Sequence, residues 1–226
     1  MNKIYNFLVL FQKIVYFIKD LFYFSVCSYC KINISNIDRK YLYLCQKCIS
    51  SISYIAPIKH KKTFFSVYAL GNYNGLLRYV VTEKYRKSSM GYEIVNDKII
   101  NMISEFKIDF DCILPVPKTA MNKLKHKLNQ TLIIAENISS YYKKEVFDCL
   151  CTRRNKEDQA GKRFKDRLSM ENDIFFIPDS QKSILTKKKI LIVDDVYTTG
   201  KTIDNILYAL SEINYESISV LVIARK

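Results

Sequence analysis

The sequence has no run of about twenty uncharged residues, so we expect no membrane-spanning helix. Its most apolar stretch, residues 4–26, is interrupted by Lys13, Lys19 and Asp20, and no small-residue cleavage site follows it. A secretory signal peptide is therefore not expected either. We assign residues 1–26 to an amphipathic helix that docks on its own domain or on a partner, with a membrane surface as the less favoured alternative.

Acidic residues are scarce relative to basic ones: 22 Asp and Glu against 36 Lys and Arg give a formal net charge of +14. A basic balance suits nucleic acid or anionic substrates as partners. The sequence is also rich in Lys, Ile, Asn and Tyr, as in proteins from AT-rich genomes, so the charge is weak support for nucleic-acid contact. Internal repeats and low-complexity linkers are absent, and 226 residues suffice for one main domain and a small module.

Residues 189–202 carry the most chemical information in the chain. The apolar run 190–193 is typical of a buried parallel strand. Asp194 and Asp195 follow it, then a loop of small hydroxylated residues with glycine, then a segment with helical apolar spacing. Ligands of open α/β sheets bind beyond the carboxyl ends of the strands, and a helix N-terminus offers N–H donors to a phosphate. The pattern therefore predicts an anion site.

The composition of the loop narrows the ligand. Thr198, Thr199 and Thr202 add hydroxyl donors, and Gly200 allows the backbone to approach the anion closely. Two carboxylates would repel a phosphate, but they suit sugar hydroxyls if a divalent cation offsets their charge. Ribose 5-phosphate meets these demands. The simplest alternative is a βα turn with ordinary caps; a Walker A loop is excluded because it requires glycine where Asp195 stands.

This segment resembles the phosphoribosyl pyrophosphate motif of type I phosphoribosyltransferases. The resemblance assigns Asp194 and Asp195 to the ribose 2′- and 3′-hydroxyls and the loop to the 5′-phosphate, with Mg²⁺ as the cation. Tyr197 either approaches the acceptor or packs beneath the loop. The binding residues implied are Asp194, Asp195, Val196, Tyr197, Thr198, Thr199, Gly200, Lys201 and Thr202.

Four cysteines near the other end of the chain have the spacing of a metal site. Cys27, Cys30, Cys45 and Cys48 form two C-x2-C pairs, and two such pairs complete a tetrahedral thiolate shell around zinc. The shell is closed, so the zinc is expected to be structural. His60 would be a ligand only if a cysteine were displaced. A disulfide framework is disfavoured because no export signal is expected, and an iron–sulfur cluster is a minor alternative.

The remaining cysteines have no metal spacing, and Cys112 is expected to be a small buried hydrophobe. Strands alternating with helices indicate a parallel α/β sheet. We expect strands at 64–71, 110–116, 190–193 and 217–224, a further one at 146–151, and helices at 75–87, 92–106, 128–142 and from 202. The domains expected are an N-terminal helix (1–26), a zinc module (27–56), a connector at 57–62 and an α/β domain (64–226).

The whole chain resembles the ComF family, in which a four-cysteine zinc module precedes a phosphoribosyltransferase domain. Beyond the two main motifs, the resemblance is carried in order by Tyr73-Asn-Gly-Leu-Leu-Arg with Lys84-Tyr-Arg, Leu114-Pro-Val-Pro-Lys, Asn129-Gln130, and Gln159-Ala-Gly with Arg167. The chain departs from the family at His126-Lys127-Leu128, where Arg-Gly-Phe is usual, and at Met170, where Asn is common. These departures point to an altered acceptor side of the pocket.

The resemblance implies a type I phosphoribosyltransferase-like sheet flanked by helices, with a zinc-ribbon-like module. Its catalytic residues would be Asp194, Asp195, Lys118 and Arg167. Arg154 and Arg163 are further candidates to hold pyrophosphate, on a stretch (152–168) that is either a mobile lid or a solvated loop.

Two functions are compatible with these features. The first is a cytoplasmic phosphoribosyltransferase with an unknown nitrogenous acceptor, which the family resemblance associates with natural competence and DNA uptake. The second is a DNA-uptake adaptor that binds single-stranded DNA or a helicase partner and uses the pocket as a nucleotide sensor.

Overall fold

The computed structural model describes residues 25–34, 44–60, 65–87, 92–117, 129–152 and 175–226. The chain divides into two compact units, Met1–Ser51 and Ile52–Lys226. Most of the expected N-terminal helix (1–26) lies outside the described residues. Within the part that the structure describes, no helix is long and apolar enough to cross a membrane.

The described residues of the first unit form a short antiparallel pair and one helix. Strands β1 (Ser25–Val26) and β2 (Asn33–Ile34) pair with each other, and helix α2 (Gln46–Ser50) follows later in the chain. Its described interior is small, with Leu44 and Ile49 buried beside two cysteines. The described residues of this unit therefore bury little apolar surface, and a bound metal would add to the stability of such a small unit.

The second unit is built on a six-stranded sheet. The spatial order is β3 (Ile58–His60), β4 (Phe65–Ala69), β10 (Ser217–Arg225), β9 (Lys189–Tyr197), β5 (Cys112–Pro115) and β6 (Glu145–Val146). All neighbouring strands are parallel except β3 and β4, which are antiparallel. The predicted parallel sheet is thus confirmed, with one antiparallel strand at its edge.

Two details of the sequence prediction were wrong. Ile58–His60 form an edge strand, not a connector, because their backbone pairs with β4. No single strand covers 146–151. Glu145–Val146 form β6 of the large sheet, whereas β7 (Cys151–Thr152) pairs with β8 (Phe175–Phe176) in a separate two-stranded sheet. Both errors concern strands of two or three residues, which are too short to show an alternating pattern.

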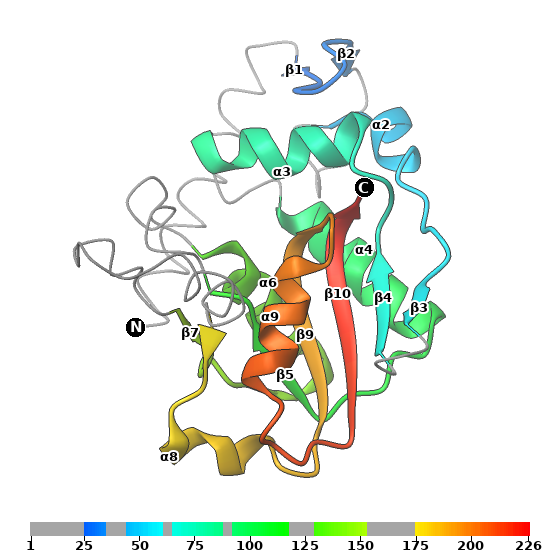
Figure 1. Cartoon of the computed structure of the whole chain (residues 1–226). Helices are drawn as coiled ribbons and strands as arrows, with labels where there is room; N and C mark the ends of the chain where they lie inside the picture. Colours follow the sequence, from blue (N-terminus) through cyan, green and yellow to red (C-terminus); the bar gives the residue numbers. More distant parts are fainter. Residues whose placement is uncertain (1–24, 35–43, 61–64, 88–91, 118–128, 153–174) are drawn as a thin grey trace, which may run out of the picture. The chain divides into compact units, whose positions relative to one another are not determined.

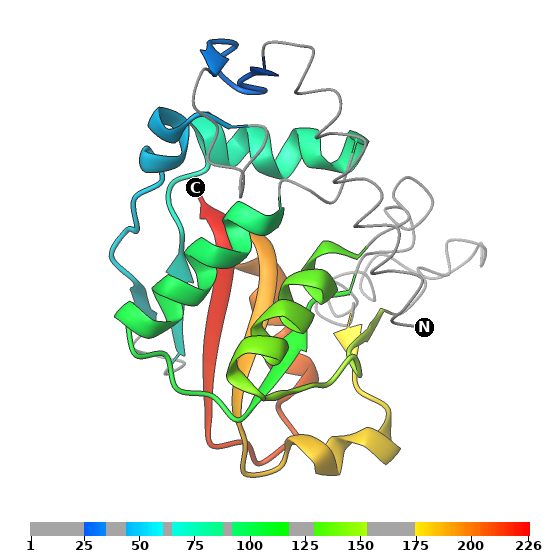
Figure 2. The same ribbon diagram turned by 180° about the vertical axis from the view of Figure 1, so that it is seen from behind.

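Helices cover both faces of the large sheet. Helix α9 (Lys201–Ala209) lies over one face (Figure 1), while α4 (Tyr92–Glu105) and α6 (Gln130–Tyr142) lie over the other (Figure 2). Helix α3 (Gly75–Lys87) follows β4 and packs near β10. A short helix α8 (Asp179–Lys182) with a 3-10 turn (Ser183–Leu185) precedes β9. The helices expected at 75–87 and 92–106 are confirmed, and the one expected at 128–142 begins at Gln130.

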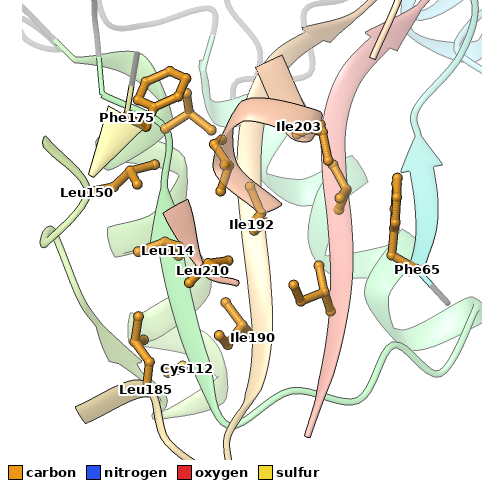
Figure 3. Packing of buried hydrophobic residues seen from close by; sticks show 14 of the residues in the cluster. Phe65, Cys112, Leu114, Leu150, Phe175, Leu185, Ile190, Ile192, Ile203 and Leu210 are labelled. Carbon is orange, nitrogen blue, oxygen red and sulfur yellow. The ribbon is translucent and has the colours of Figure 1, made fainter. Parts of the chain in front are cut away.

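The apolar core alternates between the two faces of the central strands. Ile190 and Ile192 of β9 pack toward α9 together with Leu114 and Ile203 (Figure 3). Because side chains alternate along a strand, Leu191 and Val193 face the opposite side, where α6 covers β9. Both faces of β9 are therefore buried, and its register is fixed by the core up to the point where the acidic pair begins.

Candidate functional site

The carboxyl ends of the parallel strands β4, β10, β9 and β5 lie at one edge of the large sheet. The N–H of Val116, just beyond β5, donates to the carbonyl of Val193 at 2.9 Å, and the N–H of Lys226 donates to the carbonyl of Tyr197 at 3.0 Å. On the far side of β10, the N–H of Arg225 donates to the carbonyl of Gly71 at 3.0 Å. These bonds bring the segments that follow β4, β5 and β9 together at the edge where α/β sheets bind ligands.

The acidic pair lies within β9, which extends to Tyr197, and not beyond the strand end as expected. Asp194 is opposite Val222 of β10 and is 8% exposed, whereas Asp195 is half-buried. Successive side chains of a strand point to opposite faces. The N–H of Asp195 donates to Oδ1 of Asp194 at 2.8 Å and satisfies one lone pair of the buried carboxylate.

The environment of Asp194 favours its neutral form. Burial raises the pKa of this carboxyl to about 8, and the neighbouring charge of Asp195 acts in the same direction. The N–H of Asp195 acts against them. A cation or hydroxyl donors beside such a carboxyl would stabilise its ionised form. The acidic pair is therefore suited to a ligand that brings both.

The raised pKa of Asp194 makes the stability of the ligand-free protein depend on pH. The unfolded carboxyl loses its proton near its ordinary pKa of 3.8, while the folded one keeps it up to about 8, so stability should fall as pH rises across this range. Asp194→Asn removes this titration. We expect the variant to be more stable than the natural protein by over about 1 kcal/mol near pH 8, and by little below about pH 4.

Chemical denaturation across this pH range measures the difference. Asp109→Asn is the matched control: Asp109 is exposed and bonded to Lys189, which holds the pKa of its carboxyl below the usual value. The control should keep the fall in stability with rising pH. A stability difference between Asp194→Asn and the natural protein that stays constant with pH would contradict the raised pKa.

The loop after β9 turns sharply into α9. Thr198 and Thr199 are exposed, Gly200 is buried, and Gly200 has φ +85°, in the left-handed region that favours glycine. The N–H of Asp204 donates to the carbonyl of Gly200 at 2.9 Å and begins the helix. The first N–H groups of a helix have no acceptor within it. Exposed hydroxyls and these N–H groups together form a surface suited to a phosphate.

Several predicted site residues lie outside the described residues. They are Lys118 and Arg167, the further candidates Arg154 and Arg163, and the departures His126, Lys127, Leu128 and Met170. Among the described residues, Tyr73 follows β4 at the carboxyl edge, where its N–H donates to the carbonyl of Arg225 at 2.7 Å. Tyr73, one of the residues that carry the ComF resemblance, is therefore bonded at this edge. Asn129, another of them, is bonded to Thr131, which contacts the segment that follows β5.

Thr131 was missed by the sequence analysis. Its hydroxyl is 2.6 Å from the carbonyl oxygen of Val116 and 2.8 Å from Oδ1 of Asn129. These contacts fasten the N-terminus of α6 to the Pro-Val-Pro turn after β5, and Thr131 and Gln130 are both buried. Its position directly after Asn129-Gln130 was the only indication in the sequence that Thr131 lies near the site. A threonine in a helical segment has no distinctive pattern of its own.

The four cysteines of the first unit converge. Their Sγ atoms all lie within 4.8 Å of one another; Cys27 and Cys48 are 3.8 Å apart, and Cys30 and Cys45 are 3.6 Å apart. Cys27 and Cys30 lie on a tight turn, which is closed by the N–H of Lys31 donating to the carbonyl of Cys27 at 2.9 Å. The second pair comes from the start of α2, where Cys45 is the N-cap.

This arrangement fits a tetrahedral metal ion. Zinc–sulfur bonds of about 2.3 Å place the sulfurs of a tetrahedron about 3.8 Å apart, close to the distances found, whereas a disulfide needs about 2.05 Å. Burial tends to raise the pKa of Cys27, but N–H groups such as that of Cys45 outweigh it and lower the pKa to about 6, whereas burial and the neighbouring thiols raise the pKa of Cys48. A bound cation would favour the thiolate form of all four cysteines. The cluster therefore has the ligands to hold a metal ion such as zinc.

The other cysteines belong to the second unit. Cys112 and Cys149 are buried, and burial raises the pKa of their thiols, to about 12 for Cys112 and about 11 for Cys149. Such thiols are poor nucleophiles, and neither residue belongs to a group with metal-binding geometry in the part of the chain that the structure describes. The prediction that Cys112 is a buried hydrophobe is confirmed. Among the described residues, the four-cysteine cluster is the group with metal-binding geometry.

Sheet order, the acidic pair and the glycine loop before α9 define an α/β protein with a phosphoribosyltransferase-type fold. Residues 82–226 match the family model of the phosphoribosyl transferase domain. This match covers well over half of the chain, so the protein belongs to the phosphoribosyl transferase domain family. No curated protein matches the sequence significantly.

Several solved structures are similar to this chain. Glutamine phosphoribosylpyrophosphate amidotransferase from B. subtilis is 13% identical, over 74% of this chain and 35% of that one, with a TM-score of 0.44. Purine phosphoribosyltransferase from Pyrococcus horikoshii is 18% identical, over 58% and 82%, with a TM-score of 0.37. Adenine phosphoribosyltransferase from Saccharomyces cerevisiae is 9% identical, over 80% and 90%, with a TM-score of 0.42.

The extent of these similarities differs from one structure to another. The chain spans 35% of the B. subtilis amidotransferase and 23% of the allosteric regulatory enzyme of purine biosynthesis, to which it is 15% identical with a TM-score of 0.38.

Proposed function

We propose that this protein binds phosphoribosyl pyrophosphate with Mg²⁺ and transfers its phosphoribosyl group to a nitrogenous acceptor. The observation that carries the proposal is the sequence of β9, the acidic pair, the glycine loop and α9 at the carboxyl edge of the sheet, in a chain of this family. An acidic pair with one buried and one half-buried carboxyl, beside exposed hydroxyls and a helix N-terminus, suits a ligand that is a sugar at one end and a phosphate at the other.

Each part of the site has a proposed role. Asp194 and Asp195 accept hydrogen bonds from the ribose 2′- and 3′-hydroxyls, and the segment 196–202 surrounds the 5′-phosphate. Bound Mg²⁺ offsets the charge of the carboxylates and of the pyrophosphate. Lys118 and Arg167, which lie outside the described residues, are proposed to bind the pyrophosphate.

Transfer breaks the bond between C1′ and the pyrophosphate oxygen while the acceptor nitrogen attacks C1′. The electron pair of the broken bond leaves with the pyrophosphate, and the sugar gains positive charge in the transition state. The protein's part is to hold the ribose by its hydroxyls, neutralise the leaving group with cations, and exclude water from C1′.

A panel assay tests this function. Pyrophosphate release from phosphoribosyl pyrophosphate is measured with Mg²⁺ against nucleobases and amines, and steady turnover with any acceptor supports transfer. Asp194→Asn together with Asp195→Asn is the matched negative control. Binding without turnover on a broad panel would reduce the proposal to a ligand-binding protein, and absence of binding by calorimetry would overturn it.

We propose zinc as the metal of the four-cysteine cluster. Four thiolates leave no coordination position for water, so the ion would stabilise the first unit and take no part in transfer. The buried position of Cys27 and Cys48 supports this structural role because it keeps solvent away from the ligands.

A second candidate function is a DNA-uptake adaptor in natural competence, which binds single-stranded DNA or a helicase. The formal charge of +14 favours it. So does the first unit, where Tyr29 and Lys31, two positions apart in the sequence, are both exposed. Aromatic rings with basic side chains are the usual platform for single-stranded nucleic acid. In this role the phosphoribosyl pocket would serve as a nucleotide sensor in the cytoplasm.

The adaptor predicts DNA binding that weakens steeply with salt, because it would rest on lysine and arginine. Reversing four charges to Glu should abolish retention in a gel shift and leave the affinity for phosphoribosyl pyrophosphate within about twofold. No retention at about 50 mM salt, or retention unaffected by the reversals, would remove DNA as the partner. The suspected residues are Lys59, Lys61, Lys62, Lys84, Arg86 and Lys87, with Tyr85 as a stacking candidate.

A further inference from the structure

Tyr197 lies at the end of β9, directly before the exposed part of the phosphate loop. Its side chain is 8% exposed and belongs to the apolar cluster that includes Ile203 and Val222. Thr198 and Thr199, the next two residues, are exposed. The tyrosine therefore points into the protein while the hydroxyls of the loop face solvent.

The hydroxyl end of Tyr197 packs against the turning point of the loop. A Cβ atom added to Gly200 would lie 2.7 Å from the tyrosine Oη, closer than real Cβ atoms approach other atoms, and 3.3 Å from its Cζ, which is a tight contact. Gly200 also has φ +85°. Glycine is thus required twice, by its backbone angle and by the tyrosine beneath it, and the ring end occupies the space where a side chain would stand.

Tyr197 is itself held in place. Its carbonyl accepts a hydrogen bond from the N–H of Lys226 at 3.0 Å, and its strand is paired with β10. Burial raises the pKa of the Tyr197 hydroxyl; the carboxylate of Asp204 adds to the rise and the Arg225 guanidinium opposes it. The hydroxyl is consequently neutral at physiological pH, which makes it a packing and hydrogen-bonding group and not a base.

We propose that Tyr197 is a positioning residue that supports the 198–200 loop from below and holds its backbone in the conformation that binds the 5′-phosphate. This inference rests on the proposed function of the loop. It assigns Tyr197 no contact with the ligand. The loop adopts its conformation before phosphate arrives, so binding does not have to spend free energy on ordering it.

The packing of Tyr197 against the loop is expected to affect the binding of the 5′-phosphate end of the ligand only. Truncating Tyr197 removes the surface on which Gly200 rests, so the loop samples other conformations and the phosphate end of the ligand loses affinity. The pyrophosphate end is proposed to be held by other segments and should be unaffected. A residue with a merely structural role would lower stability, or weaken both ends alike.

The first experiment compares two probes by calorimetry, ribose 5-phosphate and pyrophosphate with Mg²⁺. For Tyr197→Leu we expect ribose 5-phosphate to bind at least about fivefold more weakly and pyrophosphate to bind within about twofold of the natural protein. Tyr208→Leu is the matched control, since Tyr208 is 58% exposed on α9, and both of its affinities should be unchanged. Equal losses for both probes, or no loss for either, would overturn the proposal.

The second experiment uses the contact with Gly200 and does not depend on Tyr197→Leu folding. Gly200→Ala should weaken ribose 5-phosphate binding because its Cβ meets the tyrosine Oη. Tyr197→Phe deletes that oxygen, so the double variant should bind at least about threefold more tightly than Gly200→Ala alone. Independent effects of the two changes would contradict the proposal. If the natural protein binds neither probe, the proposed function fails instead, so the two failures are distinguishable.

Discussion

Replacing Asp194 and Asp195 together with asparagine is expected to weaken the binding of phosphoribosyl pyrophosphate by at least about tenfold, or about 1.4 kcal/mol. Amides accept hydroxyl hydrogen bonds less well than carboxylates and do not retain a divalent cation. The same change should make the ligand-free protein more stable near neutral pH, because it removes a carboxyl that is 8% exposed and costly to ionise. Calorimetry in Mg²⁺ measures the affinity, and thermal unfolding measures the stability.

Weaker ligand binding together with higher stability of the ligand-free variant would show that the acidic pair serves binding at the expense of stability. Asp109→Asn, at the other edge of the sheet, removes an exposed carboxylate that contacts Lys189 at 2.8 Å and should leave the affinity within about twofold. Unchanged affinity of the double asparagine variant would show that the acidic pair has only a structural role. A loss of stability together with affinity would mean that Asp194 is ionised and paired in the folded state.

Purified protein is expected to contain about one zinc ion per chain, and Cys27→Ser or Cys45→Ser should remove it and lower solubility. A closed thiolate site contributes folding free energy directly, on the order of 10 kcal/mol for small zinc units. The described part of the first unit has few other buried apolar residues to replace that contribution. Elemental analysis measures the metal, and thermal unfolding with and without chelator measures its effect.

Cys151→Ser is the control for the cysteine variants. Cys151 is half-buried in β7 and does not belong to the cluster, so this variant should keep its zinc and its solubility. Less than about 0.2 zinc per chain in protein purified without chelator, with no iron chromophore, would refute the metal site. An iron chromophore would replace zinc with an iron–sulfur cluster.

The central strands and the long helices could be predicted from the sequence because each has a strong apolar pattern. Residues 190–193 and 220–224 are continuously buried, and α3 and α4 have buried apolar residues at helical spacing. Edge strand β3 could not be predicted, because Ile58–His60 are formed by pairing with β4 and have no alternation of their own. The extension of β9 to Tyr197 has the same cause: its pairing with β10 continues past the apolar run.

The candidate site divides in a similar way. The acidic pair, the glycine loop and the cysteine spacing are local patterns, so the sequence contains them in full. The support of Gly200 by Tyr197 and the contact of Thr131 with Val116 depend on which side chains the fold brings together. The sequence is equally compatible with a tyrosine that contacts the ligand and with one that packs inside the protein. Its burial in the structure distinguishes the two roles.

The position of β10 between β4 and β9 has a consequence for folding on the ribosome. β10 is the last of these strands to be synthesised, yet it is the one that joins β4 to the rest of the sheet. Until residues 217–225 have emerged from the exit tunnel, the edges of β4 and β9 that pair with β10 remain unpaired. Unpaired strand edges favour aggregation, so the late pairing of β10 prolongs this risk for the second unit, whereas the first unit ends at residue 51 and its four cysteines are synthesised long before β10.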